Sequence, residues 1–113
     1  MSDIRVRIAP SPTGQLHVGT ARAALFNYLF AKNQKGTFIV RIEDTDKERS
    51  KKEFETDILD SLEWLGIAAD ESPRAGGEYG PYRQSERTET HTRFLIRLLD
   101  MENAFYCFHS QGE

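Results

Sequence analysis

The chain has 113 residues, of which 38% are hydrophobic and 29% charged, with a formal net charge of −3 at pH 7. This length allows one domain at most, and the composition is that of an ordinary globular protein. No run approaches the roughly 20 apolar residues of a membrane span, and the single cysteine, Cys107, excludes an internal disulfide framework and cannot hold zinc alone. We therefore expect a cytoplasmic protein with no membrane segment.

The charge is divided unevenly along the chain. Residues 1–42 carry six lysines and arginines against one acidic residue, whereas residues 43–113 carry nine against seventeen. A basic front end suits an anionic small ligand, such as a nucleotide or an acidic substrate. The acidic remainder is not a self-sufficient nucleic-acid surface, so any RNA would bind mostly elsewhere.

Two strands and a helix between them are predicted in the first 42 residues. Apolar and charged residues alternate over residues 4–8, which predicts a strand, and the prolines and glycine of residues 10–14 end it. Residues 18–32 are apolar around most of a helical circumference, so we predict a helix buried on more than one side. The β-branched residues 37–42 predict a second strand.

A second helix is predicted after a capping-box signature, in which Ser50 is followed by Glu53. Gly66 is typical of a helix stop. The apolar residues between them recur on one helical face and are Phe54, Ile58, Leu62 and Leu65.

Residues 66–83 are a long loop rich in glycine and proline. A further helix is predicted over residues 85–102, and residues 105–108 predict a third short strand. We assign to the core Trp64 and the apolar side of this last helix, which consists of Phe94, Leu95, Leu98 and Leu99.

Strands that alternate with helices predict βα crossovers and therefore an α/β fold with a parallel sheet. Three strands are few for such a sheet, which needs cover on both faces. Because the helix over residues 18–32 is also apolar beyond one face, we expect its missing partners to lie downstream of Glu113.

The turn from the first strand into this helix is a candidate phosphate site, because helix N-termini present free N–H groups and a partial positive charge. His17, Gly19 and Thr20 lie at the helix start. Gly19 allows a ligand to approach the backbone, and the His17 ring can donate to a phosphate oxygen. A plain strand-to-helix connection explains the local pattern about equally well, and neither a GxGxxG nor a Walker motif is present.

Residues 41–46, RIEDTD, place three carboxylates and a hydroxyl at the C-terminal edge of the second strand. Ligands bind at this edge in open α/β sheets. A solvated acidic turn is the alternative, and we prefer it for residues 47–49. A calcium loop would need a glycine and a terminal glutamate that this segment lacks, so we expect no metal site.

Three segments together resemble one family. PSPTGQLHVGTARAALFNYLFAK, which begins at Pro10, resembles the HIGH-motif region of class I aminoacyl-tRNA synthetases, with residues 17–20 (HVGT) in place of His-Ile-Gly-His. Its Pro-Ser-Pro-Thr-Gly start, the RIEDTD segment and GPYRQSER at residues 80–87 are similar to bacterial-type glutamyl-tRNA synthetases. Thr20 departs from the second histidine of the signature.

The resemblance implies that residues 1–113 are the first half of a Rossmann-like parallel-sheet nucleotide-binding domain, truncated before the acceptor-stem insertion, the KMSKS half and the anticodon-binding domain. The implied reaction activates L-glutamate with ATP and Mg²⁺ to glutamyl-adenylate, and then transfers it to the 3′ end of tRNA(Glu). The tRNA would bind through domains mostly absent here. We expect the parent to be a monomer, and these residues alone to be unable to aminoacylate tRNA.

The resemblance also implies roles for particular residues. Arg7 would pair with a glutamate carboxylate through its planar guanidinium, Ser11 would hydrogen-bond the substrate carboxylate, and Glu43 would hold the α-amino group with Thr45 nearby. GPYRQSER would pack beside the active site without a catalytic role. The implied catalytic residues are His17, Gly19 and Thr20, and the implied ATP-binding residues are these three with Ala9, Pro10 and Ser11.

Some alternatives remain open. Arg7 shares a strand face with Arg5, so a structural ion pair is the alternative for Arg7 and the preferred interpretation for Arg5. A tRNA-modifying paralogue of the glutamyl-queuosine type would also activate glutamate, and would show paired cysteines just after residues 105–108. A non-catalytic nucleotide-binding or interaction module is the other alternative, and binding of neither ATP nor glutamate would favour the interaction module.

Overall fold

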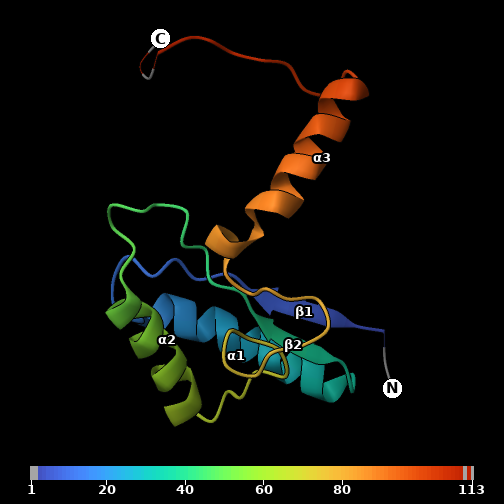
Figure 1. The fold of residues 1–113 in the computed structure, drawn as a ribbon. Coiled ribbons are helices and arrows are strands. Elements are labelled where there is room, and N and C mark those ends of the chain that lie inside the picture. Colours follow the sequence, from blue (N-terminus) through green and yellow to red (C-terminus); the bar gives the residue numbers. More distant parts are fainter. Residues whose placement is uncertain (1–2, 111, 113) are drawn as a thin grey trace.

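The computed structural model describes residues 3–110 and residue 112. No helix in this described part is long and apolar enough to span a membrane. Figure 1 shows the elements, which in chain order are β1 (Arg5–Ile8), α1 (Val18–Asn33), β2 (Thr37–Val40), α2 (Lys52–Trp64), the 3₁₀ helix η1 (Gln84–Arg87) and α3 (Thr88–Asp100).

β1 and β2 form a parallel two-stranded sheet, in which Arg5 lies opposite Thr37 and Ile8 opposite Val40. The crossover through α1 confirms the predicted α/β fold. Parallel bridges continue along the outer edge of β2, where Ile42 pairs with Arg83. This bridge brings the GPYRQSER stretch to the end of β2, next to RIEDTD.

The third strand predicted at residues 105–108 is wrong. This segment has no regular structure, and Phe105, Tyr106 and Phe108 are exposed. A strand needs a neighbour that receives its backbone hydrogen bonds. In the described part of the chain the sheet contains β1 and β2 alone, so the segment has no strand to join.

The core lies where the sheet packs against α1 and α2. Phe38, Ile42 and Leu62 are fully buried there, and the Tyr28 ring meets Phe38 edge-on at 5.8 Å between centroids. A buried Phe removes 150–250 Å² of surface from water, so Phe38 is a main contributor to stability.

Among the described residues α1 is buried on one side, and the cover predicted for its other sides is not found there. The buried residues of α1 are Ala24 and Ala31, which face the sheet. The sheet covers only the side of α1 that carries these two alanines, and their small side chains let the helix pack closely against the sheet. The opposite side is exposed and carries the apolar residues Val18, Leu25, Phe26, Leu29 and Phe30.

The capping box predicted for α2 is wrong, whereas its predicted stop is confirmed. The N-cap residue is Lys51, which makes no side-chain cap hydrogen bond. The Ser50 N–H donates to the carbonyl of Asp46 at 2.9 Å, so Ser50 closes the turn before the helix. At the other end Gly66 has a φ of +75°, the left-handed conformation that ends many helices.

The core assignments of Trp64 and of the last helix are also wrong. Trp64 is 85% exposed. α3 follows η1 and projects away from the sheet (Figure 1), and none of its residues is buried. Its apolar pattern therefore marks one helical face but not a covered one, and the side chains concerned are Phe94, Leu95, Leu98 and Leu99.

Candidate functional site

The turn between β1 and α1, residues 9–17, is fixed by contacts from two other elements. The Pro10 carbonyl accepts a hydrogen bond from the Glu43 N–H at 2.9 Å. The Leu16 N–H donates to Oδ2 of Asp57 on α2, also at 2.9 Å. The turn is therefore held at the carboxyl edge of the sheet, where open α/β folds bind ligands.

The start of α1 brings together the three residues predicted to be catalytic. Oγ1 of Thr20 lies 3.2 Å from Nε2 of His17. A Cβ added to Gly19 would lie 3.1 Å from Nδ1 of the same ring, so a larger residue there would press on the imidazole. His17 is the N-cap residue, and it makes no side-chain cap hydrogen bond.

The N-terminus of α1 can therefore receive an anion. The first N–H groups of a helix have no partner within the helix and carry a partial positive charge. No acidic residue lies in the first turn of α1 to neutralise it. Phosphate oxygens are suitable partners for such a helix end.

Two arginines converge on one carboxylate beside this turn. Arg41 donates from Nε and Nη2 to Oε1 of Glu43 at 3.0 Å each, and Arg7 reaches the same oxygen at 3.5 Å. The three side chains together carry one positive charge. The Arg7 contact is loose and its side chain is 41% exposed, so its guanidinium can accept a second carboxylate.

Arg5, by contrast, has the structural ion pair that the strand alternation favours. Its guanidinium lies 2.8 Å from Glu71. The Arg5 hydrogen bond is the main cause of a lowered pKa of Glu71, and it outweighs the opposing effect of burial. The Tyr82 hydroxyl also donates to Glu71, at 2.5 Å. Arg5 is therefore held in a close ion pair with Glu71, whereas the guanidinium of Arg7 can still bind a ligand carboxylate.

A hollow of about 460 Å³ extends from Arg7 to the turn before α1 and the first turn of α1. It contains Arg7 and Ser11, two of the four predicted glutamate-binding residues, and all the residues predicted to bind ATP. Glu43 and Thr45 are not in its wall: Glu43 touches Arg7, and Thr45 is exposed. The lining residues are Arg7, Ile8, Ala9, Pro10, Ser11, His17, Gly19, Thr20, Ala23 and Asn27.

Four residues of this region were not predicted, namely Ile8, Ala23, Asn27 and Arg41. Ala23 and Asn27 follow Gly19 at intervals of four, so they share its helical face, and that periodicity could have identified them. Arg41 has no such signal. Its role depends on Glu43 folding back toward β1, which adjacency in sequence does not reveal.

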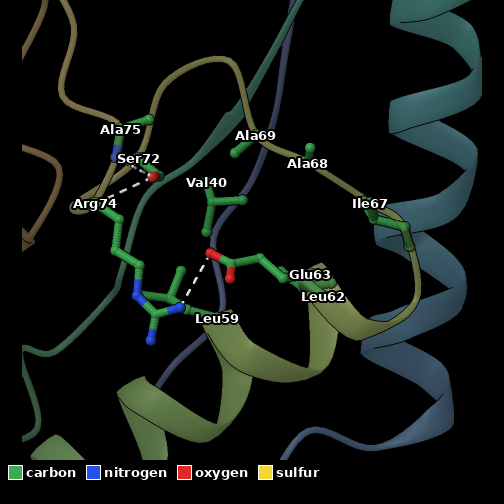
Figure 2. Close-up of a pocket in the computed structure, with 10 residues that line it drawn as sticks. All are labelled: Val40, Leu59, Leu62, Glu63, Ile67, Ala68, Ala69, Ser72, Arg74 and Ala75. Atoms are coloured by element: carbon green, nitrogen blue, oxygen red, sulfur yellow. Dashed lines mark hydrogen bonds and ion pairs between the residues drawn. The ribbon is translucent and has the colours of Figure 1, made fainter.

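A second pocket of about 310 Å³ lies between α2 and the loop that follows it (Figure 2). Its wall is mainly apolar and includes Val40, Leu59 and Ile67. Figure 2 shows Arg74 at its rim, paired with Glu63. The Arg74 guanidinium lies 3.0 Å from the Glu63 carboxylate. Since that guanidinium is already paired, this pocket offers no free cation to a phosphate or a carboxylate.

The chain matches known proteins over nearly its whole length. The family model of the catalytic domain of class I tRNA synthetases (E and Q) matches residues 3–113. A glutamate–tRNA ligase of Pseudomonas putida is 59% identical over 113 residues, which are all of this chain and 23% of that protein. Glutamate–tRNA ligase 2 of Caldicellulosiruptor saccharolyticus is 59% identical over 110 residues, which are 97% of this chain and 23% of that protein.

A solved structure is similar in fold as well. The crystal structure of a glutamate tRNA ligase from Elizabethkingia meningosepticum, in complex with its amino acid, superposes with a TM-score of 0.84 at 52% identity. The match covers 88% of this chain and 20% of that one. The chain thus spans about a quarter of the length of the relatives it matches. By motif, fold and identity, the chain belongs to the family of class I tRNA synthetases (E and Q), within their catalytic domain.

Proposed function

We propose that these residues form the N-terminal half of the catalytic domain of a glutamate–tRNA ligase, and that they supply one wall of the site that activates glutamate. The observation that carries the proposal is the hollow at the end of β1. It has a surplus arginine charge at one end and the N-terminus of α1 at the other. An acidic amino acid and the phosphates of ATP fit these two ends.

In this proposal Arg7 pairs with a carboxylate of the substrate, and Ser11 beside it hydrogen-bonds the substrate carboxylate. Glu43 accepts the α-ammonium group, with Thr45 nearby. Support comes from the loose Arg7–Glu43 contact at 3.5 Å, because a glutamate zwitterion can insert its opposite charges between these two side chains. Arg41 then holds Glu43 in place from the other side.

ATP occupies the other end of the hollow. The backbone of residues 9–11 and the first turn of α1, with Gly19, lie along the nucleotide, and His17 faces its phosphates. If the Thr20 hydroxyl donates to Nε2 of His17, the ring proton sits on Nδ1 and can be donated to a phosphate oxygen. Thr20 is then a positioning residue for that proton.

The reaction is an attack by the glutamate carboxylate on the α-phosphorus of ATP. A bond forms between a carboxylate oxygen and phosphorus, the bond to the bridging oxygen breaks, and pyrophosphate leaves with the electron pair. No protein nucleophile is needed, so this chain contributes orientation and stabilisation of the charge that develops on the phosphates.

Mg²⁺ belongs to the same proposal. The ion is commonly held by one or two carboxylates together with substrate phosphates. Among residues 3–110 and 112, no three acidic, histidine or cysteine side chains gather around a common point. In this proposal the ion enters with the triphosphate. Its chemistry would be to neutralise phosphate charge.

The whole protein would then pass the glutamyl group to the 3′ end of tRNA(Glu). We place this protein in the cytoplasm as a monomer, with tRNA contacts mainly on domains beyond these 113 residues. Support for a longer protein comes from the relatives, of which this chain spans about a quarter.

Amide chemical shifts of the isotope-labelled chain test the pocket. ATP should shift the signals of residues 9–11 and 17–20, and glutamate should shift those of Arg7 and Glu43. Arg7→Ala should weaken glutamate binding about 10- to 100-fold, the loss expected for a charge-assisted hydrogen bond, and leave ATP binding unchanged. Arg22→Ala, at an exposed arginine of α1, is the control. Binding of neither ligand would contradict the proposal and favour an interaction module.

A further inference from the structure

Asp44, the acidic residue between Glu43 and Thr45, does not line the hollow. It binds Ser85 of η1, the 3₁₀ helix at the base of α3. Its Oδ1 accepts the Ser85 N–H at 2.9 Å, and its Oδ2 accepts the Ser85 hydroxyl at 2.6 Å. Burial alone would raise the pKa of Asp44, but the bonds from Ser85 outweigh it and the pKa is lowered. The carboxylate is therefore ionised near neutral pH, and both of its oxygens are occupied by Ser85.

The segment around Ser85 is also fixed to the end of β2. The Ile42 N–H donates to the carbonyl of Tyr82 at 2.9 Å, and the Gln84 N–H donates to the carbonyl of Ile42 at 3.0 Å. One step further, Arg83 binds Glu55 of α2 through three contacts of 2.8 to 3.1 Å. These bonds tie residues 82–85 to the end of β2 and to α2.

α3 has few other constraints. None of its residues is buried, and it leaves the body of the molecule at η1 (Figure 1). Its direction is therefore set at its base, by Ser85 and its neighbours. Asp44 is the side chain that joins this base directly to the loop that carries Glu43 and Thr45.

We propose that Asp44 is a positioning residue of the glutamate pocket: it ties the Glu43–Thr45 loop to the base of α3, so that a displacement of α3 is transmitted to that loop. The inference rests on the proposed function, because Glu43 and Thr45 matter here as glutamate contacts. Asp44 itself does not touch substrate. A coupling of this kind is reciprocal, so glutamate also restrains the base of α3.

A purely structural role is the competing interpretation. Asp44 would then only cap the first turn of η1, and its loss would leave the Glu43–Thr45 loop unchanged. The two interpretations predict different hydrogen exchange at the Glu43 amide, which donates to the Pro10 carbonyl. Glu43 lies 42 residues before Ser85 in sequence. If Asp44 is a positioning residue, loss of the Ser85 contact alters exchange at the Glu43 amide, whereas a purely structural role leaves that exchange unchanged.

Amide hydrogen exchange of the full 113-residue chain tests the connection. Asp44→Ala should speed exchange of the Ser85 amide about 10- to 100-fold, the loss expected for a hydrogen bond to a charged group. Ser85→Ala should speed exchange of the Glu43 amide several-fold. Asp44→Asn keeps one acceptor oxygen and should recover part of the protection. The control is Asp46→Asn, because Asp46 lies in the same loop but binds Arg49 instead.

Glutamate and ATP titrations of the same variants separate positioning from general destabilisation. Asp44→Ala should raise the Kd for glutamate about tenfold and leave the Kd for ATP within about twofold. Asp46→Asn should change neither. If Ser85→Ala alters exchange at residues 84–88 but not at Glu43, or if Asp44→Ala weakens both ligands equally, the positioning role is wrong.

If the proposed function is wrong, the experiments give a different result from the one that excludes the positioning role of Asp44. In that case the unmodified chain does not respond to glutamate at all, and the connection between Asp44 and α3 is decided by the exchange data alone.

Discussion

The ion pair of Glu55 with Arg83 should be the most costly charge contact to break in this chain. The Glu55 side chain is 7% exposed and that of Arg83 is 25% exposed. Glu55→Ala leaves the Arg83 guanidinium in a partly buried position with Glu86 as its remaining partner. Breaking a buried ion pair from one side costs about 3–5 kcal/mol.

The expected loss is smaller than that range because Arg83 keeps some contact with water. We expect Glu55→Ala to lower the free energy of unfolding by about 2–3 kcal/mol. For a domain of this size, such a loss lowers Tm by roughly 8–15 °C. Urea unfolding followed by circular dichroism measures the free energy, and a thermal scan measures Tm.

Glu86→Ala is the matched control. Glu86 binds the same guanidinium at 3.0 Å, but its side chain is 47% exposed, so its loss should cost at most about 1 kcal/mol. An equal loss for both variants would refute the reasoning, since burial would then not decide the cost. Changing both Glu55 and Arg83 to apolar residues of similar size should recover most of the stability.

Three further outcomes follow from the described contacts. Lowering the pH below about 4.5, the ordinary glutamate pKa, should destabilise the chain. Arg5 lowers the folded-state pKa of Glu71, so the stability that the ionised Glu71 contributes is lost as the pH falls. Glu71→Gln should therefore reduce the dependence of the free energy of unfolding, measured with urea, on pH in this range. Gly77→Ala should cost several kcal/mol in urea unfolding, because Gly77 has a φ of +145° and a Cβ there would collide with the Tyr82 hydroxyl, whereas Gly14→Ala, with open space around it, should be nearly neutral. Phe38→Ala should cost about 3–5 kcal/mol and Trp64→Ala less than about 1 kcal/mol, since the first is fully buried and the second is exposed; similar losses for both would mean that Trp64 is covered in solution.

The local elements could be predicted from the sequence because local signals determine them. The alternation at Arg5–Ile8 and the apolar run of α1 gave the right elements, and Gly66 ended α2 because its position requires a positive φ. The wrong core residues share one cause. An apolar pattern such as that of α3 states which helical face is apolar, but not whether another element covers it.

The candidate site was predictable in part. Ser11, His17 and Gly19 lie near one another along the chain, so a motif could mark them, and the structure brings them to one hollow. The convergence of Arg7 and Arg41 on Glu43 requires the two strands to lie side by side in the observed register. The bond from Asp44 to Ser85 spans 41 residues, and no local pattern encodes it.

Exchange of pyrophosphate with ATP in a hybrid enzyme tests most directly whether the pocket beside Arg7 activates glutamate. The Pseudomonas putida relative would carry this chain in place of its own matching 113 residues, and glutamate-dependent exchange of pyrophosphate with ATP would be measured. We predict that the hybrid catalyses this exchange, that Arg7→Ala lowers it at least about tenfold, and that Arg22→Ala leaves it unchanged. Exchange that is as fast with Arg7→Ala as without it would contradict the claim.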